Sequence, residues 1–218
     1  MDIRFERALF AGAHLDDVEF GCGGAIARWA GSREIRLLTL TQKTRDADGR
    51  VQIVRDLEEP NEAARILGLT PEHVVIEDLD GQVLQYQAQH VREAFLRWRD
   101  DYDPDVVFVP AADDVHQDHH VVYEEALRIF RERTVIGFEV VRSTLAFRPN
   151  LFVEISAADL YKKAQSVLCY QSQLAQSAGY YFKGDIIEGQ ARFRGGQCGR
   201  EMAEAFEVYS MQWGTEGA

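Results

Sequence analysis

The chain has 218 residues, of which 46% are hydrophobic and 28% charged, a composition typical of a folded globular protein and unlike that of a disordered one. Domains cluster near ~100–200 residues, so we expect residues 1–218 to form a single domain. The formal net charge of -12 argues against nucleic acid and anionic lipid surfaces as partners, because both are negatively charged.

Neither a targeting segment nor a cysteine framework is evident. The first seven residues contain no apolar run long enough for a signal peptide, and no later segment approaches the ~18 apolar residues of a membrane helix. We therefore expect a cytoplasmic protein without membrane insertion. Cys22, Cys169 and Cys198 are widely separated and form no Cys-x-x-Cys pair, so we expect buried or half-buried side chains in place of a zinc finger or redox site.

Short apolar runs alternate with longer amphipathic stretches, which is typical of βαβ units and a mainly parallel sheet. In chain order, the pattern predicts strands at 8–13, 35–41, 74–77, 106–109, 135–141 and 151–155. The helices that alternate with and follow these strands are predicted at 24–30, 51–67, 90–100, 119–133, 157–170 and 199–206. The polar stretch 41–50 follows a strand and is expected to be an exposed loop. The predicted fold class is α/β, a single Rossmann-like domain with helices flanking the sheet.

Two polar segments follow the first and the fourth predicted strands, and four of the six histidines lie in them. The segments are Ala13-His14-Leu15-Asp16-Asp17 and His116-Gln117-Asp118-His119-His120. In a doubly wound sheet, ligands bind outside the carboxyl ends of the strands where the strand order reverses. Each segment alone is typical of a polar turn or a helix cap. Together they predict a metal site at the carboxyl ends of strands one and four.

Histidine nitrogens and carboxylate oxygens without thiolates suit Zn²⁺ in a catalytic site, where three protein ligands leave a position for water. Fe²⁺ or another divalent metal such as manganese would accept the same ligands. We therefore expect zinc as the cofactor and leave the other divalent metals open.

The chain resembles the LmbE or PIG-L family of zinc-dependent N-deacetylases over nearly its whole length. The family motif Ala-His-Pro-Asp-Asp appears at residues 13–17 with Leu15 in place of the proline, and the motif His-x-Asp-His-His appears at 116–120. Further matches lie at Lys163-Ala164, Tyr170-Gln171-Ser172-Gln173, Arg194-Gly195 and Ala203-Glu204-Ala205-Phe206. The resemblance implies that His14, Asp17 and His119 bind zinc. It also implies that Asp16 acts as general base and that His116 steadies the reacting amide.

The chemistry of amide hydrolysis explains why a metal, a free carboxylate and a hydrogen-bond donor are needed together. A metal lowers the pKa of bound water toward ~7 and polarises the amide oxygen, and a carboxylate that is not a ligand takes the proton. The adjacent Asp16 and Asp17 can point in different directions, one to the water and one to the metal. His116 would act as a cation or a hydrogen-bond donor to the oxyanion, and Asp118 would orient one of the imidazoles.

Three further assignments concern residues around this site. His120 is placed outside the ligand set. Arg55, with Glu58 and Glu59, would either line a sugar site or belong to a solvated charged face. The aromatic run Tyr180-Tyr181-Phe182 would either pack in the core or cover the sugar.

The sequence thus predicts a zinc-dependent hydrolase that removes the acetyl group from the nitrogen of an amino sugar or an N-acetylglucosamine-containing small molecule. Two alternatives stay open: an amidase that acts on a larger sugar-thiol conjugate, and a non-catalytic sugar-binding protein. The expected partner is a small amino-sugar substrate, and association into a homo-oligomer is neither predicted nor excluded.

Overall fold

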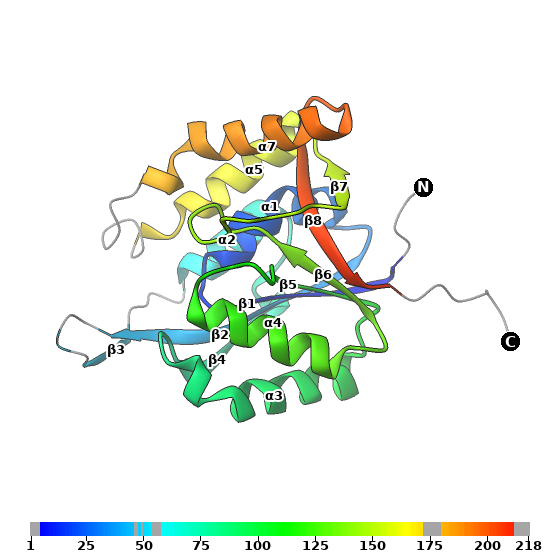
Figure 1. The fold of residues 1–218 in the computed structure, drawn as a ribbon. Helices are drawn as coiled ribbons and strands as arrows, with labels where there is room; N and C mark the ends of the chain where they lie inside the picture. The colour runs from blue at the N-terminus through cyan, green and yellow to red at the C-terminus, as the bar shows by residue number, and fades with distance from the viewer. Residues whose placement is uncertain (1–4, 46–47, 49, 54–57, 172–179, 212–218) are drawn as a thin grey trace, which may run out of the picture.

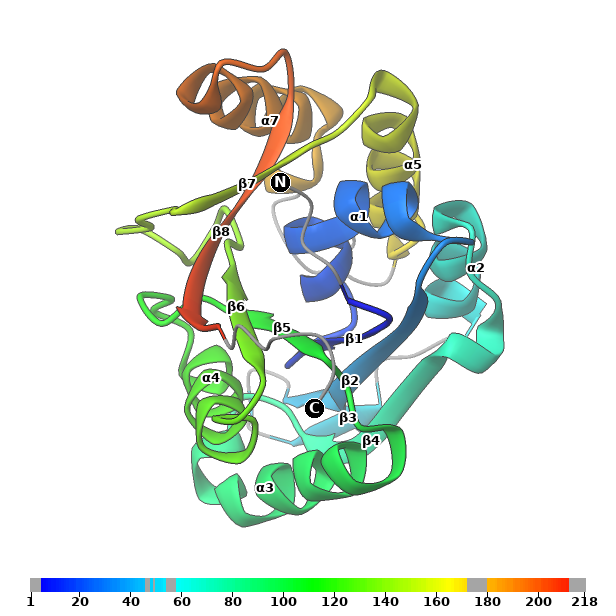
Figure 2. The same cartoon turned by 90° about the vertical axis from the view of Figure 1, so that its right-hand side faces the viewer.

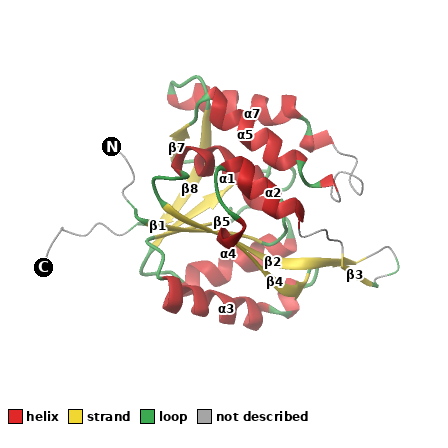
Figure 3. Ribbon diagram, turned by 180° about the vertical axis from the view of Figure 1, so that it is seen from behind, coloured by secondary structure: helices red, strands yellow, loops and turns green. Residues whose placement is uncertain are grey.

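The structure is a computed structural model that describes residues 5–45, 48, 50–53, 58–171 and 180–211. It is a single α/β domain in which one mainly parallel sheet lies between two layers of helices (Figures 1 and 3). Among the described residues, no helix combines the length and the apolar character needed to span a bilayer.

The sheet has eight strands in the order β3-β2-β1-β5-β6-β8-β7, and β4 also pairs with β2. The pairs β1–β2, β1–β5, β2–β4 and β5–β6 are parallel, whereas β2–β3, β6–β8 and β7–β8 are antiparallel. The strands are β1 (Arg7–Gly12), β2 (Glu34–Arg45), β3 (Val51–Ile53), β4 (Val74–Asp80), β5 (Val106–Pro110), β6 (Thr134–Phe138), β7 (Leu151–Glu154) and β8 (Ala203–Ser210).

The helices cover both faces of the sheet. They are α1 (Asp17–Trp29), α2 (Glu58–Leu67), α3 (Ala88–Arg97), α4 (Gln117–Ile129), α5 (Ala157–Leu168) and α7 (Gly184–Cys198). Helices α3 and α4 pack together on one face, and α1, α2, α5 and α7 lie on the other (Figure 1). Helix α7 contacts β7 and β8 at one end of the sheet (Figure 2).

The side chains of β1 show why the parallel strands appear as unbroken apolar runs. Ala8 and Phe10 lie in the core beneath α1, while Leu9 and Ala11 lie in the core beneath α3 and α4. Successive residues of a strand point to opposite faces, and both faces of this strand are covered. Burial on both sides therefore requires apolar residues at every position.

The strand order reverses at β1. From β1 the chain continues through β2 and β4 on one side and returns to β5 and β6 on the other. The carboxyl ends of β1 and β5 are therefore neighbours, and the segments 13–17 and 111–119 leave the sheet at this point. The predicted topology is confirmed, and it brings the two polar segments together.

Several predicted elements are wrong. The helix predicted at 199–206 is a turn that leads into strand β8 at Ala203, and the helix predicted at 51–67 has strand β3 at its start and helix α2 over Glu58–Leu67. Helix α7 was not predicted, and α1 begins at Asp17, well before residue 24. The stretch 41–50, expected as an exposed loop, begins as part of β2 with Thr41 fully buried.

Candidate metal centre

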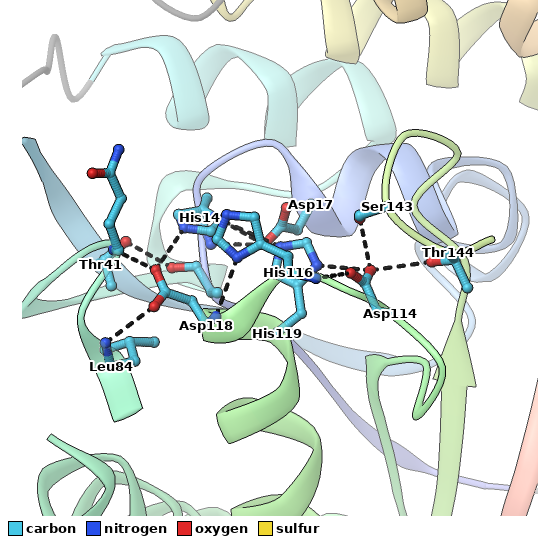
Figure 4. A network of polar contacts seen from close by, with 12 residues as sticks. His14, Asp17, Thr41, Leu84, Asp114, His116, Asp118, His119, Ser143 and Thr144 are labelled. Atoms are coloured by element: carbon cyan, nitrogen blue, oxygen red, sulfur yellow. Dashed lines mark hydrogen bonds and ion pairs between the residues drawn. The ribbon is translucent and has the colours of Figure 1, made fainter. Parts of the chain in front are cut away.

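Three donor atoms converge beyond the ends of β1 and β5. His14 Nδ1 lies 3.2 Å from His119 Nε2 and 3.3 Å from Asp17 Oδ2, and Asp17 Oδ2 lies 3.1 Å from His119 Nε2. We call these three atoms the donor triad (Figure 4). Three ligands of a tetrahedral zinc ion stand roughly 3.3 Å apart, because each bond is about 2.0–2.1 Å long. The spacing of the donor triad fits such an ion.

A carboxylate behind His14 fixes its ring. Asp118 Oδ2 lies 3.1 Å from His14 Nε2, which leaves Nδ1 directed at the donor triad. Asp118 is fully buried at the start of α4, and its two oxygens accept hydrogen bonds from the backbone amides of Leu84 and Gln82. The turn after β4 thus holds Asp118, and Asp118 holds His14, as metal-binding imidazoles are usually held.

A second carboxylate fixes His119 in the same way. Asp114 Oδ2 lies 2.8 Å from His119 Nδ1 and also accepts hydrogen bonds from the hydroxyls of Ser143, at 2.9 Å, and Thr144, at 3.1 Å. Asp114 Oδ1 accepts the backbone amide of His116 at 2.8 Å. Our reading of the sequence missed Asp114. In the sequence, the only indication of a role for Asp114 is its position between the fourth predicted strand and the second motif.

The charges of the donor triad call for a cation. Burial opposes protonation of His14, but the charge of Asp17 and the hydrogen bonds that the ring donates to Asp118 and Asp17 outweigh it and raise the pKa to about 9. Burial is likewise outweighed at His119, where Asp17 and Asp114 raise the pKa to about 10. The two imidazoles in turn hold the pKa of Asp17 well below its usual range, against the effect of burial. A divalent ion supplies the same positive charge by displacing the two protons.

Asp16 differs from its neighbour Asp17. It precedes α1 at the N-cap position, yet its side chain makes no capping hydrogen bond, and it is buried. Burial and the charge of Asp17 raise the pKa of Asp16 to about 6. A carboxylate poised near neutrality suits a base that must both accept and return a proton.

His116 stands beside the donor triad. Its ring lies 4.6 Å from that of His14 and 4.5 Å from that of His119, centroid to centroid. The donor atoms of these three histidines all lie within 4.8 Å of one another, so His14, His116 and His119 form a second candidate ligand set beside the donor triad. We favour the donor triad, because its atoms are closer together and because His116 Nδ1 already accepts the backbone amide of Asp118 at 3.2 Å.

The protonation of His116 follows from the same contacts. Burial and the nearby charges of His14 and His119 lower its pKa to about 4. A neutral imidazole whose Nδ1 accepts a hydrogen bond carries its proton on Nε2. In the metal-free protein His116 is therefore a neutral imidazole with a donor at Nε2, which favours the donor over the cation considered from the sequence.

Other residues of interest lie outside this centre. His120 is exposed on α4 and pairs with Glu124 at 3.2 Å. Arg55, the tentative sugar contact, lies outside the described residues. The aromatic run divides, because Phe182 is buried whereas Tyr180 is exposed.

The later motif matches hold α1 in place. Tyr170 donates a hydrogen bond to Glu19 Oε1 at 2.7 Å, and burial raises the pKa of Glu19 to about 8, so the pair is neutral at pH 7. Buried Lys163 lies 2.6 Å from Glu204, whose carboxylate also accepts the backbone amides of Gly24 and Ala25 in α1. These contacts fix the helix that begins at Asp17.

Relatives of known structure share the fold. A conserved protein of Thermus thermophilus is 26% identical, with 97% of this chain and 98% of that chain covered and a TM-score of 0.71. The N,N'-diacetylchitobiose deacetylase of Pyrococcus horikoshii has a TM-score of 0.75 over 94% of this chain and 84% of its own, and at 19% identity it shows the fold alone.

Sequence comparison adds the family. The uncharacterized deacetylase YaiS of Escherichia coli is 28% identical over 152 residues, which are 67% of this chain and 80% of that protein. A family model described as PIG-L: GlcNAc-PI de-N-acetylase matches residues 9–130. That range is more than half of the chain and contains the donor triad, Asp16 and His116. The chain belongs to the PIG-L (GlcNAc-PI de-N-acetylase) family.

Proposed function

We propose that this protein is a zinc-dependent N-deacetylase that releases acetate from the N-acetyl group of an amino sugar or a related small molecule. The observation that carries the proposal is the donor triad, with separations of 3.1–3.3 Å, next to a buried carboxyl whose pKa is about 6. Membership of a de-N-acetylase family supports the reaction, and the deacetylase relatives support a sugar-based substrate.

In this proposal His14, Asp17 and His119 hold the metal. When bound, the ion lowers the pKa of a water molecule and polarises the amide oxygen. Asp16 takes the proton of the attacking water and later passes it to the leaving nitrogen. His116 donates its Nε2 hydrogen to the oxygen that becomes negatively charged, and Asp114 and Asp118 keep the two ligand imidazoles in orientation.

The two alternative functions account for these observations to different degrees. An amidase for a larger sugar-thiol conjugate would use the same residues and differ in the shape of its pocket. A non-catalytic sugar-binding protein has no need for a base with a raised pKa beside a metal centre. The geometry therefore favours an enzyme over a binding protein.

Metal content and acetate release test the proposal together. Protein purified without added metal should contain about one zinc per chain, or iron if kept anaerobic, and should release acetate from members of a panel of N-acetyl sugars. Exhaustive chelation should abolish the activity and zinc should restore it. Full activity after chelation would overturn the metal assignment, and metal-loaded protein that binds the sugars without turnover would favour the binding protein.

The neighbouring histidines of α4 give a matched pair for the ligand set. His119→Ala should lose the metal, because His119 Nε2 belongs to the donor triad, whereas His120→Ala should keep it, because His120 is exposed and pairs with Glu124. Elemental analysis of both variants measures this difference in metal content. A metal-free His120→Ala beside a metal-loaded His119→Ala would show that the assignment within the second motif is wrong.

A further inference from the structure

A buried threonine in β2 holds the backbone that precedes His14. Thr41 is fully buried, and both its backbone amide and its hydroxyl donate hydrogen bonds of 2.9 Å to the carbonyl oxygen of Ala13. A carbonyl oxygen has two lone pairs, and here one residue supplies a donor for each of them. The carbonyl of Ala13 is therefore fixed in direction by Thr41, next to His14 (Figure 4).

The same peptide group also contacts a second member of the donor triad. The amide of His14 belongs to the peptide bond that carries the carbonyl of Ala13, and it donates to Asp17 Oδ2 at 2.7 Å. Because a peptide group is planar, fixing its carbonyl also fixes the direction of its N–H. Thr41 thus acts on His14 through the backbone and on Asp17 through the amide of His14.

The pairing of β2 is irregular at this threonine. Its register with β4 shifts between Thr39 and Thr41 and shifts again between Thr41 and Lys43. Irregularities of this kind re-aim a side chain and are common next to active sites. The strand gives up its regular pairing at the residue whose hydroxyl contacts Ala13.

The turn after β4 holds the ring of His14 from another side. Gln82 has a φ of 66°, in the left-handed region that residues other than glycine rarely adopt. In this conformation its amide donates to Asp118 Oδ2, the oxygen that lies 3.1 Å from His14 Nε2. Strained backbone persists where the surrounding structure enforces it, and it is most common at functional sites.

Close packing joins this turn to the end of β2. The amide of Gly81 donates to the carbonyl of Lys43 at 3.0 Å. An added Cβ at Gly81 would lie 2.4 Å from the Lys43 carbonyl oxygen and 3.3 Å from Thr41 Oγ1, so the turn can lie this close only with glycine there. Thr41 and Gln82 consequently belong to one packed unit, which supports His14 at its backbone and behind its ring.

We propose that Thr41 and Gln82 are positioning residues of the candidate metal centre. Thr41 fixes the peptide group before His14, and the left-handed backbone of Gln82 fixes the carboxylate behind the His14 ring. The inference rests on the proposed function, because it concerns the same metal ligands. Both residues act through His14 and its neighbours, so they set the directions of the ligands and thereby the affinity for the metal.

The first experiment compares Thr41→Val with Thr41→Ser in the full chain. Valine keeps the shape of threonine without the hydroxyl, whereas serine keeps the hydroxyl. Thr39→Val is the matched control, because Thr39 lies two residues earlier in β2 and is buried as well. Three quantities are measured: zinc affinity by competition with a chelating dye, the visible absorption of the Co²⁺-loaded protein, which reports the ligand geometry, and the melting temperature of the metal-free protein.

Thr41→Val should lower the zinc affinity by roughly 3- to 10-fold, the usual worth of one neutral hydrogen bond, and should change the Co²⁺ spectrum. Thr41→Ser should restore both, and Thr39→Val should leave both unchanged. A threonine with a merely structural role would instead lower the melting temperature and leave the zinc affinity and the Co²⁺ spectrum of the folded protein as they were.

The second experiment tests the backbone of Gln82. Glycine adopts a positive φ freely, so Gln82→Gly should keep the zinc affinity. The β-branched side chain of valine disfavours this conformation, so Gln82→Val should lower the affinity by roughly 10- to 100-fold, the usual effect of losing support behind a ligand. Both variants lack the glutamine side chain, so the comparison isolates the conformation of the backbone. If Gln82→Val does not fold, the variants of Thr41 decide alone.

Two outcomes overturn the inference: an unchanged zinc affinity and Co²⁺ spectrum in Thr41→Val, or equal zinc affinities in folded Gln82→Gly and Gln82→Val. A failure of the proposed function looks different. If zinc binds but no N-acetyl sugar releases acetate, the deacetylase assignment falls and these comparisons still decide the positioning roles. If no zinc binds, NMR of the metal-free protein decides them, because the ring proton between His14 Nε2 and Asp118 should exchange faster in Thr41→Val than in Thr41→Ser.

Discussion

The adjacent carboxyls Asp16 and Asp17 show how much the immediate surroundings decide at the scale of single residues. Asp17 lies between two imidazoles, which hold its pKa well below the usual range. Asp16 is buried beside that negative charge, and its pKa is raised to about 6. One residue of the doublet is thus always an anion and suits a cation. The other exchanges a proton near neutral pH and suits a base.

Asp16→Asn tests this division of roles. The amide keeps the size of the side chain but cannot accept a proton, so turnover should fall by roughly 10²–10⁴-fold while metal content stays near one equivalent. Stability should change little, because Asp16 makes no capping hydrogen bond. Metal content, melting temperature and acetate release are measured on one preparation. A destabilised variant with full activity would instead mark Asp16 as a helix cap.

The pH profile of the unaltered protein belongs to the same test. Asp16 must be ionised to accept a proton, so kcat/KM should fall as the pH drops below about 6, the raised pKa of this carboxyl. Below that pH the ionised, active fraction falls about tenfold per unit. An acidic limb near pH 4, the range of an ordinary carboxyl, would argue against Asp16 as the base.

A substitution at Asp114 tests whether this carboxylate strengthens the proposed metal binding, separately from catalysis. Asp114→Asn should weaken metal binding by roughly 10–100-fold, because His119 loses the carboxylate that orients and charges its ring. Asp113→Asn is the matched control, since Asp113 is the preceding residue and is exposed. Zinc competition with a chelating dye gives both affinities. Equal affinities in the two variants would exclude a supporting role for Asp114.

The site also shows what local sequence can and cannot reveal. The donor triad, Asp16, His116 and Asp118 lie in two compact motifs, whose residue types indicate a metal site, and the resemblance to the family supplied the individual roles. Ser143 and Thr144 support the centre from a connection whose sequence has no periodic pattern. Their role depends on β6 lying beside β5, which is a property of the assembled sheet.

Helix α1 is the element on which the centre depends, since it begins at Asp17, and its glycines let it approach the sheet and α5. An added Cβ at Gly21 would lie 2.2 Å from Phe138 Cδ2, and one at Gly23 would lie 2.9 Å from Lys163 Cγ. Phe138 ends β6 and is fully buried, so it has no room to move away. The glycines thus serve tight packing.

Gly21→Ala should therefore destabilise the protein by about 1–3 kcal/mol or more, the usual cost of overpacking a core. Gly189→Ala in α7 is the control, because an added Cβ there meets nothing within 4 Å and alanine favours the helix. It should be neutral or stabilising by up to about 1 kcal/mol. Denaturant unfolding of both variants measures the difference. Equal stability of the two would contradict the packing account.

The elements that the sequence failed to predict have physical reasons of their own. In β8 the polar Glu204 and Glu207 are buried with their hydrogen-bond partners, so the strand lacks the usual alternation of apolar and polar residues. Strand β3 is defined by pairing with β2, a contact that hydrophobic periodicity does not report. Helix α7 contains four glycines and becomes helical by packing on β7 and β8. By contrast, the central strands are buried on both faces and show plainly in the sequence.

At the scale of the whole molecule, the reversal of strand order joins residues that are about a hundred positions apart. His14 and His119 meet only because β1 and β5 are neighbours, so the proposed metal ligands exist as a set only in the folded chain. If these residues bind a metal as proposed, metal binding and folding are linked, and each should report on the other.

That linkage has a definite dependence on pH. In the metal-free protein the pKa of His14 is about 9 and that of His119 about 10, against 6.5 in an unfolded chain. A group whose pKa is raised by folding stabilises the fold fully below its unfolded pKa, and this contribution is lost as the pH rises through the folded pKa. Metal-free protein should therefore lose stability between about pH 6.5 and pH 10.

Zinc-loaded protein should behave in the opposite sense over the same range. Zinc must displace both protons, so its apparent affinity rises with pH, and tighter binding to the folded state raises the melting temperature further. The gap in melting temperature between zinc-loaded and metal-free protein should consequently widen from pH 6.5 to pH 9, the lower of the two folded pKa values. Scanning calorimetry at several pH values and a fixed concentration of free zinc measures the gap. His120→Ala should show the same widening of the gap, and His119→Ala should show none. In the unaltered protein, a gap that stays constant or narrows as the pH rises would exclude these imidazoles as the ligands that zinc deprotonates.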